Sequence, residues 1–153
     1  MVRWLSMSLL FPLVILMISD IRSRTVSSWW LLAFGILNTI FLGLLYGWKC
    51  VVLRIIGNLL LLLIIGVTLL VYAKVRHRPL AELLGVGDLI FLIAVSSAFG
   101  LTDYIKYIVG SSLIGILIWP LIRITQPHKT GVPMISVMVV AYSVVMGYRL
   151  LTA

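Results

Sequence analysis

The feature that most constrains this chain is a succession of apolar runs, each about as long as a helix that crosses a lipid bilayer. Reading each run of about 20 apolar residues as a spanning helix predicts six spans. They cover approximately residues 4–19, 29–46, 51–72, 79–101, 104–124 and 132–151. The fourth run, 89–101, is too short alone and reaches spanning length only when it starts after Pro79, which suits the first turn of a helix. The predicted fold is therefore all-α, a polytopic membrane protein with about six transmembrane helices.

The composition supports the same fold class. Of the 153 residues, 63% are hydrophobic and 10% are charged, and a water-soluble domain of this length has too little interior to bury so much apolar surface. The length predicts a single integral-membrane domain over residues 1–153. The first run ends in "SDIRSR" instead of small residues at a cleavage position, so we expect a retained helix and not a signal peptide.

Basic residues outnumber acidic residues by twelve to four, and the net charge is +8. Because the basic residues cluster between apolar runs, they indicate membrane orientation and not nucleic-acid binding. The loops after the first, third and fifth predicted helices carry more Lys and Arg than the opposite loops, and they include the densest cluster, "KVRHR" at 74–78. The positive-inside rule then predicts a multi-pass protein of the inner (cytoplasmic) membrane with both termini outside the cytoplasm.

Two of the four acidic residues are predicted to meet at one membrane face. Asp20 closes the first helix at its cytoplasmic end, and Asp88 lies near the cytoplasmic start of the fourth helix, in the stretch "LLGVGDLIFLIA". An uncompensated charge in the hydrocarbon costs about 2.5 kcal/mol or more, so these carboxylates call for an explanation. Glu82 is most simply a partner of a nearby arginine, and Asp103 a solvated loop residue or a helix N-cap.

A pair of aspartates within hydrogen-bonding reach shares one proton and titrates as a unit. One carboxylate then acts as the base on a water molecule, while the protonated partner polarises a scissile carbonyl. Asp20 and Asp88 are thus candidate catalytic residues for metal-free peptide hydrolysis. Gly85 and Gly87, just before Asp88, permit close approach of another backbone, either the first helix or an extended substrate. Small-residue packing between membrane helices remains the structural alternative for the glycines.

The segments "SDIRSRTVSSWW" at 19–30 and "GVGD" at 85–88 resemble the type IV prepilin peptidases and the archaeal preflagellin peptidases, which are GxGD membrane aspartic proteases. In that family the first helix ends with Asp and a basic turn, and a second catalytic Asp stands in GxGD at the start of a later helix. The likeness extends to six spans and to "TGVPMIS" at 130–136, which is similar to the proline-bearing start of the family's last helix.

The resemblance implies an aspartic endopeptidase that removes the short basic leader of prepilin-like precursors at the cytoplasmic membrane face, as in type IV pilus and secretion systems. By this resemblance Asp20 and Asp88 are the catalytic residues, and no cofactor is needed. The motif and substrate-approach residues are Gly85, Gly87, Arg22 and Arg24. The arginines have a second interpretation as anchors to lipid phosphates. The substrate's own membrane helix implies lateral approach from the lipid bilayer.

Three positions depart from the family pattern. Ile90 stands where many members carry Lys, and Ser27 stands where they usually have Pro. The loop between the first two helices also lacks the cysteine-rich insertion that accompanies N-methylation. We therefore expect peptidase activity without methyltransferase activity.

Other functions are open at this point. A small transporter or channel would use Asp20 and Asp88 for cation or proton binding, with Asn38 and Asn58 as further polar groups in the membrane. Lipoprotein signal peptidases also use two aspartates but usually have four helices, and an assembly protein that keeps the fold without activity is a third possibility. His77 and His128 are isolated and Cys50 is the only cysteine, so no metal site is predicted. The pattern predicts no oligomeric state.

Overall fold

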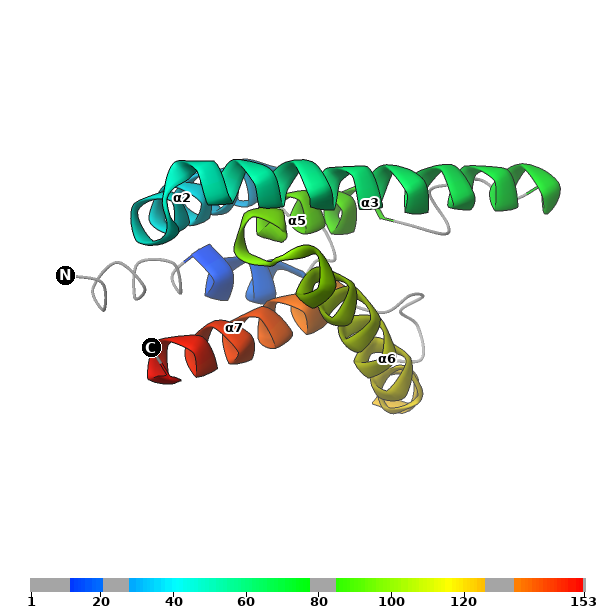
Figure 1. Cartoon of the computed structure of the whole chain (residues 1–153). Helices are drawn as coiled ribbons and strands as arrows, with labels where there is room; N and C mark the ends of the chain where they lie inside the picture. Colours follow the sequence, from blue (N-terminus) through cyan, green and yellow to red (C-terminus); the bar gives the residue numbers. More distant parts are fainter. Residues whose placement is uncertain (1–11, 21–27, 78–84, 126–133, 153) are drawn as a thin grey trace.

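The structure is a computed structural model that describes residues 12–20, 28–77, 85–125 and 134–152. Every element in these ranges is helical, which confirms the predicted all-α class. Residues 12–20 form a helix, followed along the chain by α2 (Ser28–Tyr46), α3 (Trp48–Val75), α5 (Val86–Val95), the short 3₁₀ helix η1 (Ser96–Ala98), α6 (Leu101–Thr125) and α7 (Met134–Thr152) (Figure 1).

Three of the described helices are long and apolar enough to cross a membrane: Ser28–Tyr46, Trp48–Arg76 and Leu101–Pro120. They correspond to the second, third and fifth predicted spans, so the chain is an all-α membrane protein. The third helix extends beyond the predicted 51–72 at both ends. Its early start follows from Gly47, whose φ of 85° reverses the chain directly after α2 and leaves no loop.

The fourth predicted span differs most from expectation. Its described part consists of the apolar helical stretch Val86–Ala98, too short to cross a bilayer, and residues 78–84 lie outside the described ranges. The polypeptide then turns straight into α6, three residues before the predicted start of the fifth span. The first and sixth predicted spans are represented by helical residues 12–20 and by α7.

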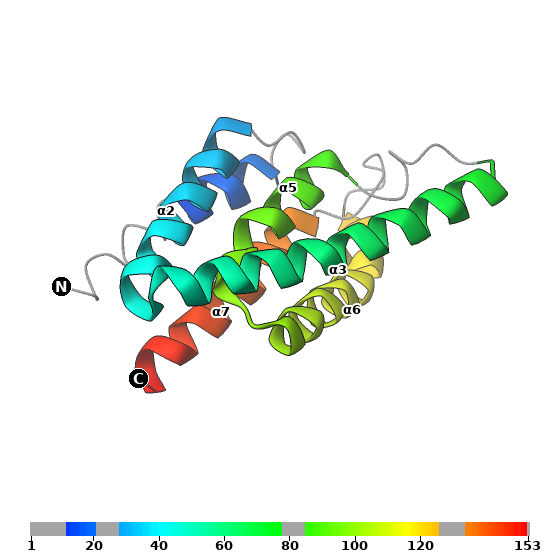
Figure 2. The same cartoon turned by 45° about the horizontal axis from the view of Figure 1, so that its top comes forward.

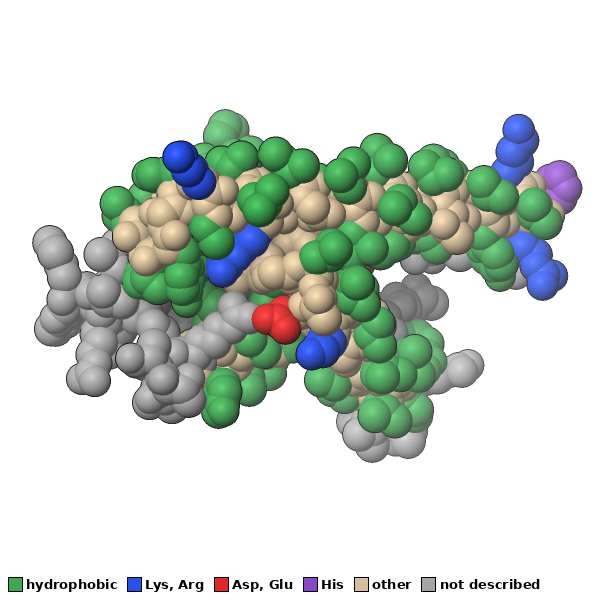
Figure 3. Space-filling model, viewed as in Figure 1, with side chains coloured by type: hydrophobic (Ala, Val, Ile, Leu, Met, Phe, Trp, Pro, Cys, Tyr) green, Lys and Arg blue, Asp and Glu red, His purple; other side chains and the backbone are tan. Residues whose placement is uncertain are grey.

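Helix α5 lies at the centre of the molecule. It packs against α2 and α7, while the η1 turn that follows it packs against α3 (Figures 1 and 2). α5 runs in the opposite direction to α3, so its first turn lies toward the C-terminal half of α3, which carries Lys74 and Arg76 at its end (Figure 2). The outer surface of the bundle is covered with apolar side chains, as expected for a surface that faces lipid (Figure 3).

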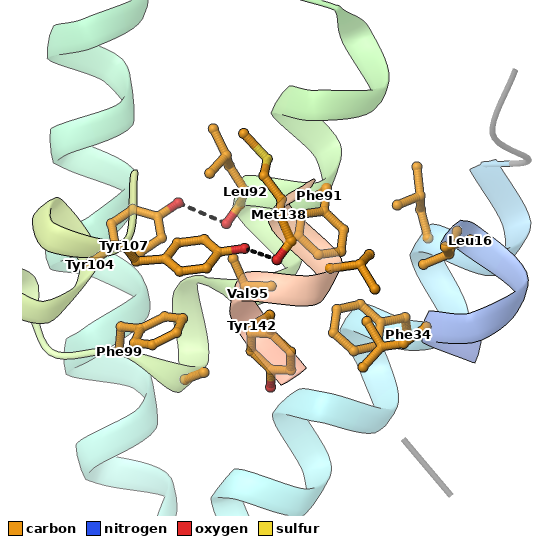
Figure 4. Close-up of a cluster of buried hydrophobic side chains, with 14 of the residues drawn as sticks. Leu16, Phe34, Phe91, Leu92, Val95, Phe99, Tyr104, Tyr107, Met138 and Tyr142 are labelled. Carbon is orange, nitrogen blue, oxygen red and sulfur yellow. Dashed lines mark hydrogen bonds between the residues drawn. The ribbon is translucent and has the colours of Figure 1, made fainter. Parts of the chain in front are cut away.

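Aromatic rings fill the space between α5 and its neighbours (Figure 4). Phe34 from α2 stacks on Phe91 from α5 with ring centroids 5.7 Å apart, and Tyr142 from α7 meets Phe34 edge-on at 5.6 Å. Phe99 stacks on Tyr107 at 4.8 Å. Such offset and edge-to-face pairs add about 0.5–1.5 kcal/mol each beyond their buried area. The ring contacts thus fix the positions of α2, α5, α6 and α7 relative to one another.

The end of α5 lies inside the protein, where its last carbonyl groups need donors. Side chains from other helices supply them. Asn58 Nδ2 on α3 donates to the carbonyl oxygens of Ser96 (2.7 Å) and Phe99 (2.8 Å), and Tyr104 Oη on α6 donates to the Leu92 carbonyl oxygen at 2.8 Å. These bonds set how deep α5 sits in the bundle, and so where its first turn begins.

Asn38 on α2 has a similar structural use. It is fully buried, and its Nδ2 donates to the Ala94 carbonyl oxygen and to Ser97 Oγ, both at 3.2 Å. Its Oδ1 accepts a 2.6 Å hydrogen bond from Tyr142 Oη. One amide therefore joins α2, α5, η1 and α7.

Candidate functional site

Asp20 is the last described residue of the first helix, and its side chain is buried, with 6% of the residue exposed. Its Oδ2 accepts two hydrogen bonds from Ser136, one from the backbone N–H at 2.8 Å and one from Oγ at 2.7 Å. Ser136 is the third residue of α7, and first-turn N–H groups have no partner within their own helix. The carboxylate thus satisfies an orphan donor at the positive end of the α7 dipole.

Asp88 lies in the first turn of α5, as Ser136 lies in the first turn of α7. It is the third residue of α5, half-buried, and lies outside the three helices that are long enough to cross a membrane. Its carboxylate accepts a hydrogen bond from the backbone N–H of Gly85, the N-cap residue. This is the reach-back half of a capping box. The first turn of α5 therefore orients the Asp88 side chain.

The structure brings the two aspartates close enough to interact electrostatically. The pKa of Asp88 is raised to about 6, first by burial and second by the negative charge of Asp20, while the Gly85 hydrogen bond lowers it. Each cause has the expected sign, because burial and a like charge both disfavour the ionised form. Asp20 and Asp88 are far apart in the sequence, and they meet where the first turns of α5 and α7 come together.

Gly87 allows those two first turns to approach. A Cβ atom on Gly87 would lie 3.0 Å from Cδ1 of Ile135, which directly precedes Ser136 in α7. An alanine at position 87 would need the Ile135 Cδ1 methyl to move by a few tenths of an ångström. The glycine therefore serves the close approach of a neighbouring helix here.

Gly85 makes a different contact, which leads to a test. A Cβ atom on Gly85 would lie 2.9 Å from Oδ2 of Asp88, although the backbone (φ −68°, ψ 139°) is open to alanine. We expect Gly85→Ala to turn the Asp88 carboxylate and lower any activity that depends on it by about tenfold or more, with little change in stability. The matched control is Gly57→Ala on α3, where a Cβ meets nothing within 4 Å. Equal activity of the two variants in a precursor-cleavage assay would contradict this prediction.

Three residues named from the sequence cannot be placed relative to the two aspartates. Arg22, Arg24 and Ser27 fall outside the described residues, so their predicted roles stay predictions. Ile90, at the position of the family's lysine, lies on α5 two residues beyond Asp88 and is half-buried. Asp103 lies in the first turn of α6, close to its predicted place at a helix start. Within the described ranges, no three His, Cys, Asp or Glu residues gather as a metal site would require.

Ser136 is the site residue that sequence reasoning missed. The stretch "TGVPMIS" was noted for its proline, but the serine three positions later binds Asp20. A serine in the first turn after a proline is typical of a helix start, where its backbone N–H and hydroxyl can donate hydrogen bonds. The pattern contained no indication of which carboxylate those donors would reach.

Comparisons of the chain with protein-family models, with curated proteins and with solved structures found no match. The resemblance to prepilin peptidases thus depends on the two aspartate motifs and on the arrangement of spans.

Proposed function

We propose that the chain is an intramembrane aspartic endopeptidase that cleaves the short basic leader of prepilin-like precursors. The observation that carries the proposal is the electrostatic coupling of Asp20 and Asp88 at the junction of two helix starts. Two interacting carboxylates in a desolvated place share a proton, which is the requirement of an aspartic dyad.

The hydrogen bonds divide the roles between the two aspartates. Asp20 accepts both Ser136 donors on Oδ2, which hold the carboxylate in place, so we assign it as the base that removes a proton from water. Asp88 has the raised pKa and is the acid that donates a hydrogen bond to the scissile carbonyl. As the tetrahedral intermediate collapses, the proton held on Asp20 passes to the leaving amine. Both aspartates return to their starting protonation states, the water is consumed in the new carboxyl group and amine, and the cycle uses no metal or covalent intermediate.

The position of the dyad supports cleavage near one membrane face. The first turn of α5 lies toward the basic end of α3, where Lys74 and Arg76 follow a long apolar stretch. By the positive-inside rule that end faces the cytoplasm, and the chain is a multi-pass protein of the cytoplasmic membrane with both termini outside. The precursor's leader is then cut on the cytoplasmic side, and no methyltransferase activity accompanies the cut.

The transport alternative gains no support from the described residues. Asn38 and Asn58, its candidate polar groups within the membrane, donate their amide hydrogens to carbonyl and hydroxyl oxygens at the end of α5. Those bonds are a structural use of both amides. The two aspartates, the other residues of that alternative, both lie at the starts or ends of helices on one side.

The proposal is tested by cleavage in a membrane. The purified chain is reconstituted in liposomes with a pilin-like precursor that carries a basic leader and one apolar helix, and product N-termini are identified by mass spectrometry. We expect a single new N-terminus at the junction of leader and helix. Failure to cut a panel of such precursors, with the chain shown to be folded, would overturn the proposal.

The pH dependence of cleavage provides an independent check on the roles. Below a pH of about 6 the Asp88 carboxyl keeps its proton and acts as the acid, and above that pH it loses the proton. We expect kcat/KM to fall by about tenfold for each pH unit on the alkaline side, because kcat/KM reports ionisations of the free enzyme. The measurement is kcat/KM from pH 5 to 8 in liposomes. A rate that stays level across this range contradicts the assignment of Asp88 as the acid.

A further inference from the structure

The hydroxyl group of Ser136 is buried and lies between two possible acceptors. Its Oγ is 2.7 Å from Oδ2 of Asp20 and 3.4 Å from the carbonyl oxygen of Met17, and the residue is 7% exposed. A hydroxyl has only one proton to donate. The carboxylate receives it, because hydrogen bonds to an ionised acceptor are shorter and stronger than those to a neutral carbonyl. The Ser136 side chain is therefore committed to Asp20.

The backbone N–H of Ser136 donates to the same oxygen for a separate, structural reason. Ser136 is the third residue of α7, where an N-cap side chain usually accepts the free N–H. Pro133 precedes the helix in the sequence, and its side chain contains no acceptor. Asp20, from another helix, accepts this N–H instead. The capping bond needs only a backbone N–H at position 136, whereas the second bond needs a hydroxyl there.

The two bonds make the two oxygens of the Asp20 carboxylate unlike. Both hydrogen bonds that the structure describes for this side chain end on Oδ2. A proton added to Oδ2 would meet two donor hydrogens and would displace at least one of them. A proton added to Oδ1 disturbs neither bond, because the neutral carboxyl group keeps Oδ2 as its carbonyl oxygen, which still accepts both donors. Oδ1 is thus the oxygen that can gain and lose a proton without rearrangement.

We propose that Ser136 is a positioning residue for the dyad, whose two donors occupy Oδ2 of Asp20 and leave Oδ1 to take the proton from water. The inference rests on the proposed peptidase function and goes further, because it names the reacting atom and the residue that selects it. When water attacks, one of its O–H bonds breaks, the proton passes to Oδ1 and the water oxygen bonds to the scissile carbonyl carbon. The leaving amine later takes this proton from Oδ1. The carboxyl group keeps its orientation throughout, since both Ser136 bonds persist.

The test removes the hydroxyl and keeps the capping N–H. With Ser136→Ala, we expect kcat for precursor cleavage in liposomes to fall by about tenfold or more, while KM stays the same. With one donor left, the carboxylate turns about its Cβ–Cγ bond, and Oδ1 faces the water for only part of the time. The thermal unfolding midpoint should fall by less than about 6 °C, because one hydrogen bond is lost and the helix cap is kept.

Ser143→Ala is the matched control in the same helix. Ser143 is half-buried about two turns further along α7, and its hydroxyl donates to the Val139 carbonyl oxygen at 2.8 Å. Its kcat should match the wild type within about twofold. Ser136→Thr returns a hydroxyl to the site and should restore kcat to within about fivefold of the wild type. A hydroxyl that only packed α7 would change the amount of folded protein and not the kcat of the folded fraction.

The outcomes separate this inference from the peptidase proposal. If the wild type cuts the precursor and Ser136→Ala cuts it with the kcat of Ser143→Ala, the hydroxyl does not select the oxygen, and the inference is wrong although the peptidase proposal stands. The same holds if folded Ser136→Thr is as slow as Ser136→Ala. If the wild type cuts no precursor, the peptidase proposal fails and this inference fails with it.

Discussion

Asp88→Asn is expected to abolish precursor cleavage, lowering kcat by about four orders of magnitude or to background. Asparagine keeps the size of the side chain and its hydrogen bond from Gly85, but it cannot hold and release the shared proton. Asp20→Asn should have the same effect, because its amide can still accept from Ser136 but cannot take a proton from water. The measurement is the rate of leader release in liposomes at fixed protein and precursor concentrations.

The matched control is Asp103→Asn. Asp103 is the third residue of α6, as Asp88 is the third residue of α5, so the same charge is removed from the same position of a helix away from the dyad. Cleavage by this variant should stay within a few-fold of the wild type. Residual cleavage above one-tenth of the wild-type rate in either Asp20→Asn or Asp88→Asn would show that the residue is structural and that the dyad mechanism is wrong.

Asn38→Leu is expected to lower the free energy of unfolding by about 2–3 kcal/mol. Leucine has as many side-chain heavy atoms as asparagine and the larger volume, so the substitution leaves no cavity and removes the hydrogen bonds. The substitution removes the partners of the Ala94 carbonyl, Ser97 Oγ and Tyr142 Oη in a buried site. Thermal or detergent unfolding of the purified protein measures the effect.

Thr68→Val serves as the control for this prediction. Thr68 is exposed, and its hydroxyl only donates to the carbonyl oxygen of Ile64 within its own helix. Its loss should change the free energy of unfolding by less than about 0.5 kcal/mol. If the two variants unfold alike, the Asn38 amide does not hold the end of α5, and another interaction sets the depth of that helix.

Helix positions could be predicted well where apolar length decides them. The second span was predicted at 29–46 and is Ser28–Tyr46, because a run of apolar residues in lipid has no alternative to a hydrogen-bonded helix. The fourth was predicted less well. Its described helix ends at Val95, with η1 closing it, because Tyr104 and Asn38 donate to the Leu92 and Ala94 carbonyls and Asn58 donates to the Ser96 carbonyl just beyond. Side chains from three other helices decide that end, and no local pattern in 83–101 reveals them.

In the candidate site too, the residues could be predicted from the sequence but their contacts could not. Asp20 and Asp88 were identified from the sequence alone, because a carboxylate beside lipid is costly enough to stand out in an apolar chain. That the two interact depends on α5 and α7 meeting at Gly87 and Ile135, a contact between residues far apart in the sequence. The role of Ser136 depends on the same contact.

The all-α membrane class and the two candidate carboxylates can be predicted from the amino-acid sequence. Both follow from the cost of placing polar groups in hydrocarbon, which each residue incurs independently of its neighbours. Only the packing of the helices against one another sets which donors orient Asp20 and where α5 stops. These features depend on distances between helices, and such distances are set by the packing of small and aromatic side chains between elements that the sequence keeps far apart.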